Sequence, residues 1–253
     1  MAECQRASRT NLGKSVTRPM DNNQEPSRAR EKVKIGDRRN RRKHLNRNPL
    51  QRWLMRRFHE RVVRLTHAAL TTSGSLNDLP VDTSSPGQPR SESRVLEVGC
   101  GEGFVLGYLR SRLPGYPYQG VDFDAAALTD AAQRNPGIPL SVADITALPF
   151  ADRSFRMVLC LEVLEHLADP VAGLAELGRV ADGPLLVSVP NQPFFALSNF
   201  MRGKNWGSLG DDPEHVHHWS GSAFVELVRA TLYVTRVVYS FPWVMVLAER
   251  SHP

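Results

Sequence analysis

The feature that most constrains the fold is a short apolar segment that runs directly into three glycines at alternate positions. The string Arg-Val-Leu-Glu-Val-Gly-Cys-Gly-Glu-Gly occupies residues 94–103, and an apolar segment with helical character, residues 104–113, follows it. Glycines in such a turn allow positive φ angles and let a ligand lie against bare backbone, beside the N–H groups of the next helix. The spacing is G-x-G-x-G rather than the G-x-G-x-x-G of dinucleotide sites, which favours a ligand without a pyrophosphate.

Strand-like and helix-like segments alternate through the rest of the chain. Further strands are expected at residues 118–123, 140–143, 157–163 and 185–189, with helices at 125–135 and 170–180. This alternation predicts an α/β fold with a mostly parallel sheet and helices on both faces. After a helix at 223–231, the apolar runs 233–240 and 244–248 are expected to form a hairpin at the sheet edge.

Two more strand ends carry an acidic residue. Asp122 lies 122 − 99 = 23 residues after Gly99, at the end of the second strand, where a carboxylate can accept both ribose hydroxyls. Asp144 ends the third strand and can accept from an adenine amino group, while Ile145 packs on the ring. Each acid alone is more often a strand-end cap. Three consecutive strand ends with suitable polar groups favour a nucleoside site, because ligands of open α/β sheets bind at the carboxyl ends of the strands.

Charge is distributed unevenly along the chain. Residues 1–66 hold 19 Lys and Arg against 6 Asp and Glu, a net charge of 19 − 6 = +13, whereas the remainder holds 13 against 20, a net of −7. Residues 1–48 have few large apolar side chains, so they are expected to form a disordered basic arm. The arm is interpreted as a plain extension, as a nucleic-acid or anionic-surface binder, or as a transit peptide, the last disfavoured by its acidic residues. Its densest basic cluster is Arg38, Arg39, Arg41, Arg42 and Lys43.

An amphipathic helix is expected at residues 49–70, followed by a Ser-, Thr-, Pro- and Gly-rich linker at 71–93 and the main domain at 94–253. The helix is expected to pack its apolar stripe on this domain, and peripheral contact of its basic face with a membrane is the alternative. The stripe is Leu50, Trp53, Leu54, Phe58, Val62, Leu65 and Ala69; the basic face is Arg52, Arg56, Arg57, Arg61 and Arg64.

Membrane spans and disulfides are not expected. No apolar run approaches the roughly 18 residues of a spanning helix, and the first residues lack the apolar core of a secretory signal. The three cysteines are scattered and show no C-x-x-C spacing. This pattern is typical of a reduced, cytoplasmic protein.

From residue 48 to 253 the sequence resembles the class I S-adenosylmethionine-dependent methyltransferases, most closely the type 11 subgroup that includes ubiquinone and menaquinone biosynthesis enzymes. The strings that produce the resemblance are Leu96-Glu97-Val98-Gly99-Cys100-Gly101-Glu102-Gly103, Gly120-Val121-Asp122, Ala143-Asp144, Leu148-Pro149-Phe150 and Ser154-Phe155. The resemblance implies a Rossmann-like sheet of seven strands with the last strand antiparallel, and S-adenosylmethionine as the cofactor.

The resemblance also implies roles for individual residues. Glu97 would orient the methionine amino group through the loop, and the three glycines, Gly99, Gly101 and Gly103, would face the methionine and sulfonium end of the cofactor. Asp122 would hold the ribose, Asp144 and Ile145 the adenine, and Phe123 would add packing.

Residues after the fourth strand are the candidates for the acceptor side. The segment Glu162-Val163-Leu164-Glu165-His166 places bases and possible metal ligands at a strand's carboxyl end. In ubiquinone O-methyltransferases and small-RNA 2′-O-methyltransferases, comparable E-x-x-E-H segments hold a divalent metal that polarises the acceptor hydroxyl. A later histidine completes the site in the RNA enzymes, and His215, His217 and His218 are available for that role here. A general base at His166, a metal site and a structural role remain open, and no metal is assigned. Residues 203–221, with His215, His217 and His218, are expected to form a lid over the acceptor; Asn191 either faces the acceptor or shapes a turn.

The sequence therefore predicts a methyltransferase that O-methylates a small molecule: a quinone-like, phenolic, sugar or lipid-linked acceptor. Glu165, His166 and His215 are its candidate catalytic residues. The alternatives are an RNA methyltransferase that uses the basic arm, and a non-catalytic cofactor-binding protein; a nicotinamide-dependent oxidoreductase would need a longer glycine turn.

Overall fold

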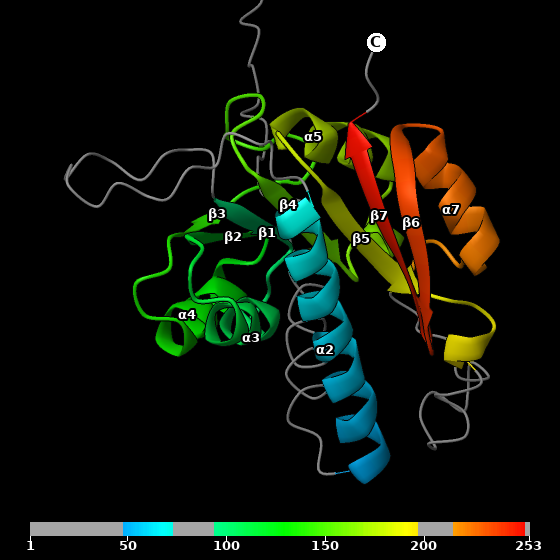
Figure 1. Cartoon of the computed structure of the whole chain (residues 1–253), viewed down its shortest axis with the longest axis horizontal. Coiled ribbons are helices and arrows are strands. Elements are labelled where there is room, and N and C mark those ends of the chain that lie inside the picture. Colours follow the sequence, from blue (N-terminus) through cyan, green and yellow to red (C-terminus); the bar gives the residue numbers. More distant parts are fainter. Residues whose placement is uncertain (1–47, 73–93, 197–214, 251–253) are drawn as a thin grey trace, which may run out of the picture.

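The computed structural model describes residues 48–72, 94–196 and 215–250, and these form one α/β unit (Figure 1). Seven strands make a single sheet in the order β3-β2-β1-β4-β5-β7-β6. The strands are β1 (Val95–Val98), β2 (Tyr118–Asp122), β3 (Leu140–Val142), β4 (Met157–Leu161), β5 (Leu185–Pro190), β6 (Leu232–Ser240) and β7 (Trp243–Arg250).

The first five strands are parallel, and only the last strand of the chain runs the other way. β7 pairs antiparallel with β5 on one side and with β6 on the other. The predicted Rossmann-like sheet with an antiparallel last strand, and the hairpin at its edge, are therefore confirmed. All parallel strands end at one edge of the sheet, where the site described below lies.

Capping side chains define where the covering helices begin. Asp124 caps α4 (Ala125–Arg134) by accepting from the Ala126 N–H, and Asp169 caps α5 (Pro170–Val180), whose proline occupies the first turn. Ser220 caps α7 (Gly221–Arg229) in the same way. Such caps satisfy N–H groups that have no partner within the helix. Two further helices are α3 (Phe104–Arg112) and the short 3₁₀ helix η2 (Leu164–His166).

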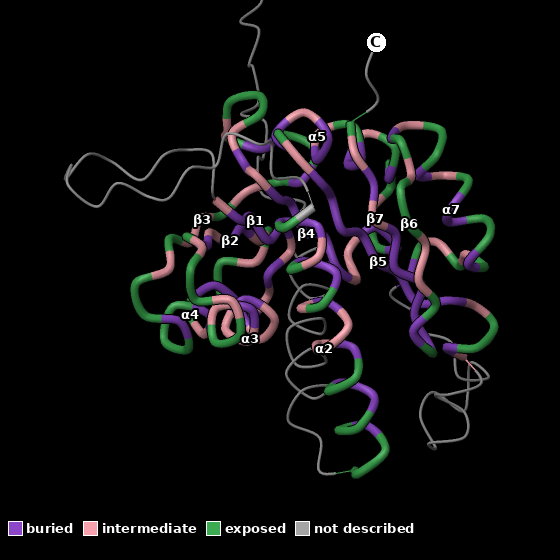
Figure 2. Tube along the Cα trace, in the orientation of Figure 1, coloured by how far each residue is buried: buried purple, intermediate pink, exposed green. Residues whose placement is uncertain are grey.

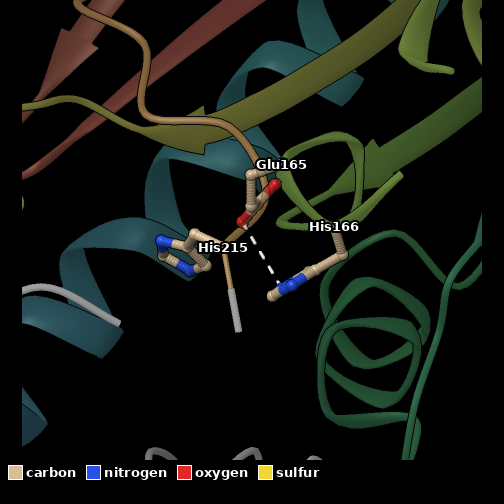
Figure 3. A group of neighbouring side chains, drawn as sticks. All are labelled: Glu165, His166 and His215. Carbon is tan, nitrogen blue, oxygen red and sulfur yellow. Dashed lines mark ion pairs between the residues drawn. The ribbon is translucent and has the colours of Figure 1, made fainter. Parts of the chain in front are cut away.

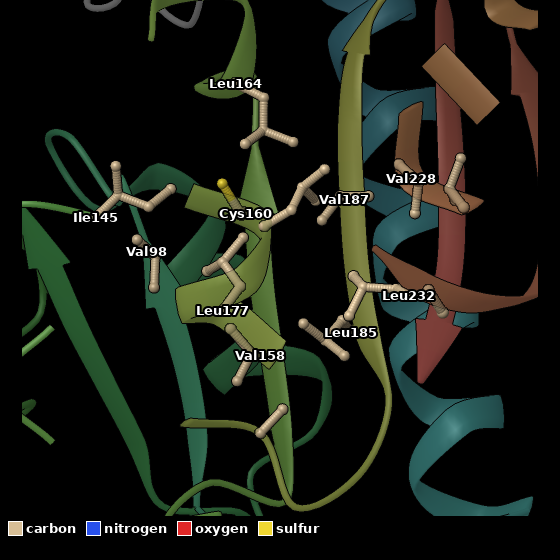
Figure 4. Close-up of a cluster of buried hydrophobic side chains, with 14 of the residues drawn as sticks. Val98, Ile145, Val158, Cys160, Leu164, Leu177, Leu185, Val187, Val228 and Leu232 are labelled. Carbon is tan, nitrogen blue, oxygen red and sulfur yellow. The ribbon is translucent and has the colours of Figure 1, made fainter. Parts of the chain in front are cut away.

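Two apolar clusters fill the two faces of the sheet, because the central strands are buried on both sides. One cluster joins β1, β4 and β5 to α5 and α7, and includes Leu177, Leu185 and Val228 (Figure 4). The other joins the opposite face to α3 and to α2 (Pro49–Thr72), through residues such as Leu106, Leu159 and Met245.

Helix α2 packs on the sheet through the predicted apolar stripe from Leu54 onward, whereas the first two stripe residues, Leu50 and Trp53, are 49% and 42% exposed. Phe58, Val62 and Leu65 are buried in the second cluster, and exposed residues alternate with them along the helix (Figure 2). In Figure 1 its N-terminal half, in blue, projects beyond the sheet on the side where β5 ends. The helix continues to Thr72, two residues into the expected linker; the expected disordered arm lies outside the described residues, except Asn48, and so does most of the linker. No helix of the described ranges combines the length and the apolar character needed to cross a bilayer.

Candidate functional site: the glycine turn and the acceptor edge

The turn after β1 needs its glycines for both conformation and space. Gly99, Gly101 and Gly103 have φ angles of 75°, 51° and 71°, in the left-handed region that favours glycine. A Cβ at Gly99 would collide with the side chain of Val163 beyond β4, so the glycine turn and the β4 turn touch directly.

Asn135, at the end of α4, supports the same turn from the far side. Its buried Nδ2 donates to the Gly103 carbonyl at 2.9 Å and to the Ala131 carbonyl at 3.2 Å. Sequence reasoning placed Asn135 only at a helix end. Its link to a glycine 32 residues earlier depends on how α3 and α4 pack, which no local pattern encodes.

Glu97 is a buried carboxyl inside β1, just before the glycines. Its Oε2 has no hydrogen-bond partner among the described residues. Burial, reinforced by the charge of Asp122, raises the pKa of Glu97 to about 8. A buried carboxyl with an unsatisfied oxygen suits a ligand that brings a cationic donor, such as the amino group of a methionine moiety.

Asp122, at the end of β2, is locked in place by backbone donors. One oxygen accepts from the Gly101 N–H at 2.6 Å and the other from the Asp124 N–H at 2.8 Å. Burial raises the pKa of Asp122 above its usual value, and these hydrogen bonds oppose the rise. The contact with Gly101 brings the predicted ribose acid and the predicted methionine loop together, in the arrangement expected of a nucleoside ligand.

The residues predicted for adenine take different positions. Phe123 is 68% exposed beside Asp122 and is free to pack on a ring. Asp144 is exposed, and its Oδ1 accepts from the Thr146 N–H at 2.8 Å and hydroxyl at 2.7 Å; these bonds lower the pKa of Asp144. Ile145 is buried in the first apolar cluster and appears within it in Figure 4. The structure thus leaves Phe123 and Asp144 accessible to a base and places Ile145 in the core.

The three candidate catalytic residues do come together (Figure 3). One ligand atom from each of Glu165, His166 and His215 lies within 4.8 Å of those of the other two. His166 Nε2 is 4.0 Å from Glu165 Oε1, and the ring centroids of His166 and His215 are 5.0 Å apart. Glu165 and His215 are buried, while the His166 side chain is 38% exposed. The cluster therefore presents one accessible imidazole backed by a buried carboxylate and a second imidazole.

Backbone bonds hold the His215 segment against η2. The Glu165 carbonyl accepts from the N–H groups of Val216 at 2.9 Å and His217 at 3.1 Å. The His217 ring lies 3.0 Å from the Leu167 carbonyl and stacks on Trp219 with centroids 4.7 Å apart. The described end of the expected lid is therefore fixed next to the cluster; residues 203–214 lie outside the described ranges.

Glu162 faces a different neighbourhood, although the sequence places it in the same motif. Its Oε2 accepts from the Trp243 indole N–H at 2.7 Å, and its Oε1 from the Ser188 hydroxyl at 3.3 Å. Glu162 has a φ of 61°, which turns the chain sharply after β4. Asn191 Oδ1 likewise accepts from the Gly221 N–H at 2.7 Å, so this residue shapes the end of β5 and the start of α7.

The cluster has donors that suit a divalent metal. Carboxylate and imidazole ligands bind zinc and similar ions at about 2.0–2.2 Å, so two ligand atoms of one ion lie at most about 4.4 Å apart. The observed limit of 4.8 Å fits such an ion after a small side-chain adjustment. Glu165, His166 and His215 would be its protein ligands.

The segment that contains the glycine turn is similar to known methyltransferases. Residues 96–184 match the model of a methyltransferase domain. Over 111 residues the chain is 34% identical to a Mycobacterium tuberculosis protein named as a probable S-adenosylmethionine-dependent methyltransferase, covering 43% of this chain and 40% of the relative. It is 33% identical over 117 residues to the demethylmenaquinone methyltransferase of Beutenbergia cavernae, covering 44% and 48%. It is also 33% identical over 102 residues to the ubiquinone biosynthesis O-methyltransferase of Ralstonia nicotianae, covering 38% and 42%. The matches span less than half the length of each of these relatives.

Solved structures share the fold at low sequence identity. One is a chain of the complex between the Haloferax volcanii Trm112 methyltransferase activator and a methyltransferase, with 19% identity, a TM-score of 0.52 and coverage of 64% of this chain and 84% of the other. Another is the [4+2]-cyclase SpnF, with 16% identity, a TM-score of 0.53 and coverage of 76% and 82%. Residues 96–184 therefore match a methyltransferase domain, and the described part of the chain shares its fold with these solved structures.

Proposed function

We propose that this protein transfers the methyl group of S-adenosylmethionine to a hydroxyl oxygen of a small-molecule acceptor. The observation on which this rests is the Glu165–His166–His215 cluster, which the fold assembles from two separate segments at the strand edge next to the glycine turn. Glu97, the three glycines and Asp122 would hold the cofactor, and Phe123 and Asp144 would flank its adenine.

The cluster matches what methyl transfer to oxygen requires. A sulfonium methyl is already activated, so the protein must align the acceptor and remove the proton of its hydroxyl. His166 is the accessible member and would take that proton. Glu165, buried at 4.0 Å, would stabilise the imidazolium that forms, and His215 borders the same space. A positioned base of this kind adds about 10²–10⁴-fold to a rate.

A divalent ion held by the same three residues would polarise the hydroxyl oxygen and lower its pKa. In both mechanisms, with and without a metal, His166 lies beside the acceptor oxygen and Glu165 supplies negative charge behind it. A chelator separates the two mechanisms, because methyl transfer without a metal continues in its presence.

Label transfer tests the proposal. The protein is incubated with methyl-labelled S-adenosylmethionine and an extract of its host cells, with and without a chelator, and label is followed in organic-soluble and nuclease-sensitive fractions. We expect label in the organic-soluble fraction, and a loss of about 10²-fold or more in His166→Ala and Glu165→Gln. His218→Ala is the matched control, because His218 is exposed and its ring lies 6.0 Å from His215, outside the cluster. Equal rates in all three variants would remove the cluster from the mechanism.

An RNA acceptor is the second candidate, and the net charge of +13 in residues 1–66 favours it (19 − 6). Deletion of residues 1–47 separates the two. An RNA enzyme would lose affinity and much of its salt dependence, whereas transfer to a small molecule would be unchanged. Label in the nuclease-sensitive fraction would establish the RNA reading.

A further inference from the structure

A groove of about 520 Å³ runs between α2 and α3, apart from the cluster at the acceptor edge. Its walls combine guanidinium groups with aromatic rings and include no carboxylate. The His59 and Tyr108 rings, one from each helix, both line the groove, with centroids 5.1 Å apart. The lining residues are Pro49, Arg52, Trp53, Met55, Arg56, His59, Phe104, Tyr108 and Arg112.

Three arginines give the groove a concentrated positive charge. Arg52 and Arg56 lie one helical turn apart on α2, and Arg112 faces them from α3; all three are exposed. Within the described residues none of the three forms an ion pair, whereas Arg153, Arg179 and Arg229 do. Like charges one turn apart repel each other in a helix, and this repulsion destabilises it. An anion bound between the two guanidinium groups would remove that repulsion.

The groove also begins at the cofactor turn. Phe104, one of its walls, is the first residue of α3 and directly follows Gly103. On the other side α2 borders the acceptor edge, because Phe58 packs at 4.8 Å on Trp243, whose indole N–H donates to Glu162. A molecule held in the groove therefore lies beside the residue that follows the glycine turn, and against the helix that packs on Trp243.

We infer that this groove binds the anionic group of the methyl acceptor, a phosphate or diphosphate ester, through Arg52, Arg56 and Arg112. The inference rests on the proposed function and narrows its substrate class. Guanidinium groups offer paired N–H donors that match phosphate oxygens, which favours a phosphate over an uncharged sugar or phenol. Trp53 and Tyr108 supply apolar surface for the part of the acceptor next to the anion. Burial lowers the pKa of His59 to about 4, so this ring stays neutral and adds no charge of its own.

The test uses dodecyl phosphate as a soluble phosphate ester with an apolar tail, and full-length protein at physiological salt. Calorimetry compares wild type with the double variant Arg52→Gln/Arg56→Gln and with Arg112→Gln. The matched control is Arg64→Gln, on the same helix but outside the groove, where the guanidinium contacts the Glu60 carbonyl. Residues 1–47 are present unchanged in all four proteins. S-adenosylhomocysteine binding is measured in parallel as a check on folding and on the cofactor site.

We expect at least a tenfold loss of dodecyl phosphate affinity in the double variant, a smaller loss in Arg112→Gln, and wild-type behaviour in Arg64→Gln. S-adenosylhomocysteine affinity should stay unchanged in all of them.

The inference is overturned if wild type does not bind dodecyl phosphate or if Arg64→Gln loses as much affinity as the double variant. It is equally overturned if the losses appear for S-adenosylhomocysteine instead, which would assign the groove to the cofactor. If wild type binds phosphatidylglycerol vesicles but not dodecyl phosphate, the groove is a membrane contact rather than an acceptor site. If wild type fails to bind S-adenosylhomocysteine at all, the proposed function fails, while arginine-dependent binding of dodecyl phosphate would still establish the anion site.

Discussion

At the scale of single residues, we predict that Glu97 makes cofactor binding sensitive to pH. The pKa of its buried carboxyl is about 8 against an ordinary 4.5, so below pH 8 the free protein holds a proton there. A cationic amino group beside Glu97 would favour the ionised form, and binding would then release that proton. We predict that S-adenosylhomocysteine affinity falls by up to about tenfold per pH unit below pH 8. Calorimetry in buffers of different ionisation enthalpy measures both the affinity and the released proton.

Glu97→Gln should bind more weakly at pH 8 and lose the pH dependence between pH 6 and 8. The free variant should also be more stable than wild type at pH 8. The folded pKa lies above the unfolded one, so the wild-type carboxyl opposes folding increasingly as pH rises from 4.5 to 8. Glu226→Gln, at an exposed position paired with Arg229, is the control and should change neither property. A Glu97→Gln variant with an unchanged pH profile would remove Glu97 from the cofactor site.

Gly99 and Gly137 together separate backbone strain from lack of space. Both have a left-handed φ, 75° and 84°, but a Cβ at Gly99 would strike Val163 whereas a Cβ at Gly137 meets nothing within 4 Å. Gly137→Ala should cost about 1–2 kcal/mol of stability from conformation alone. Gly99→Ala should cost about 1–3 kcal/mol more and weaken S-adenosylhomocysteine binding. Chemical denaturation and calorimetry measure the two effects.

The double variant Gly99→Ala/Val163→Ala tests whether contact between the two turns is the cause. Shortening Val163 should restore much of the stability lost in Gly99→Ala, because it removes the atoms that the new Cβ meets. No recovery would mean that φ alone governs this position.

At the scale of elements, regular patterns were predictable and long-range pairings were not. Strand–helix alternation predicted a mostly parallel sheet, and the apolar runs 233–240 and 244–248 predicted the edge hairpin, because both depend on local periodicity and turn chemistry. The E-x-x-E-H spacing suggested Glu162, Glu165 and His166 as neighbours. The positive φ of Glu162 turns its side chain toward Trp243 instead, and His215 joins the other two. A one-residue change of backbone region after a strand cannot be read from spacing.

Core placement of Ile145 has the same origin. Ile145, predicted to pack on an adenine ring, is 7% exposed, and its side chain approaches Gly173 of α5. Periodicity identifies an apolar residue but does not choose between a ligand and a helix as its neighbour. The role of Asn135 likewise depends on tertiary packing. Asn135 lies 32 residues after Gly103, and only the packing of α4 beside the glycine turn brings its amide to the Gly103 carbonyl.

At the scale of the whole molecule, α2 is part of the domain core and connects that core to the acceptor edge. Phe58 is 3% exposed, packs on Trp243 with ring centroids 4.8 Å apart, and so backs the indole that donates to Glu162. Phe58→Ala should cost about 3–5 kcal/mol, the usual cost of emptying a buried aromatic site. Its effect should reach the β4 turn, because Trp243 loses the surface that fixes its indole N–H. We therefore expect a lower denaturation midpoint together with a reduced kcat for methyl transfer.

Trp53→Ala is the matched control, since Trp53 is 42% exposed on the same helix and its removal should shift the denaturation midpoint little. Trp243→Phe separates the two consequences of Phe58→Ala. It keeps the aromatic packing but removes the donor to Glu162, so it should lower kcat with a smaller loss of stability. If Phe58→Ala unfolds the chain no more easily than Trp53→Ala, α2 is an appendage rather than core. If stability falls but the residual folded protein turns over at the wild-type rate, the helix supports the fold without influencing the acceptor edge.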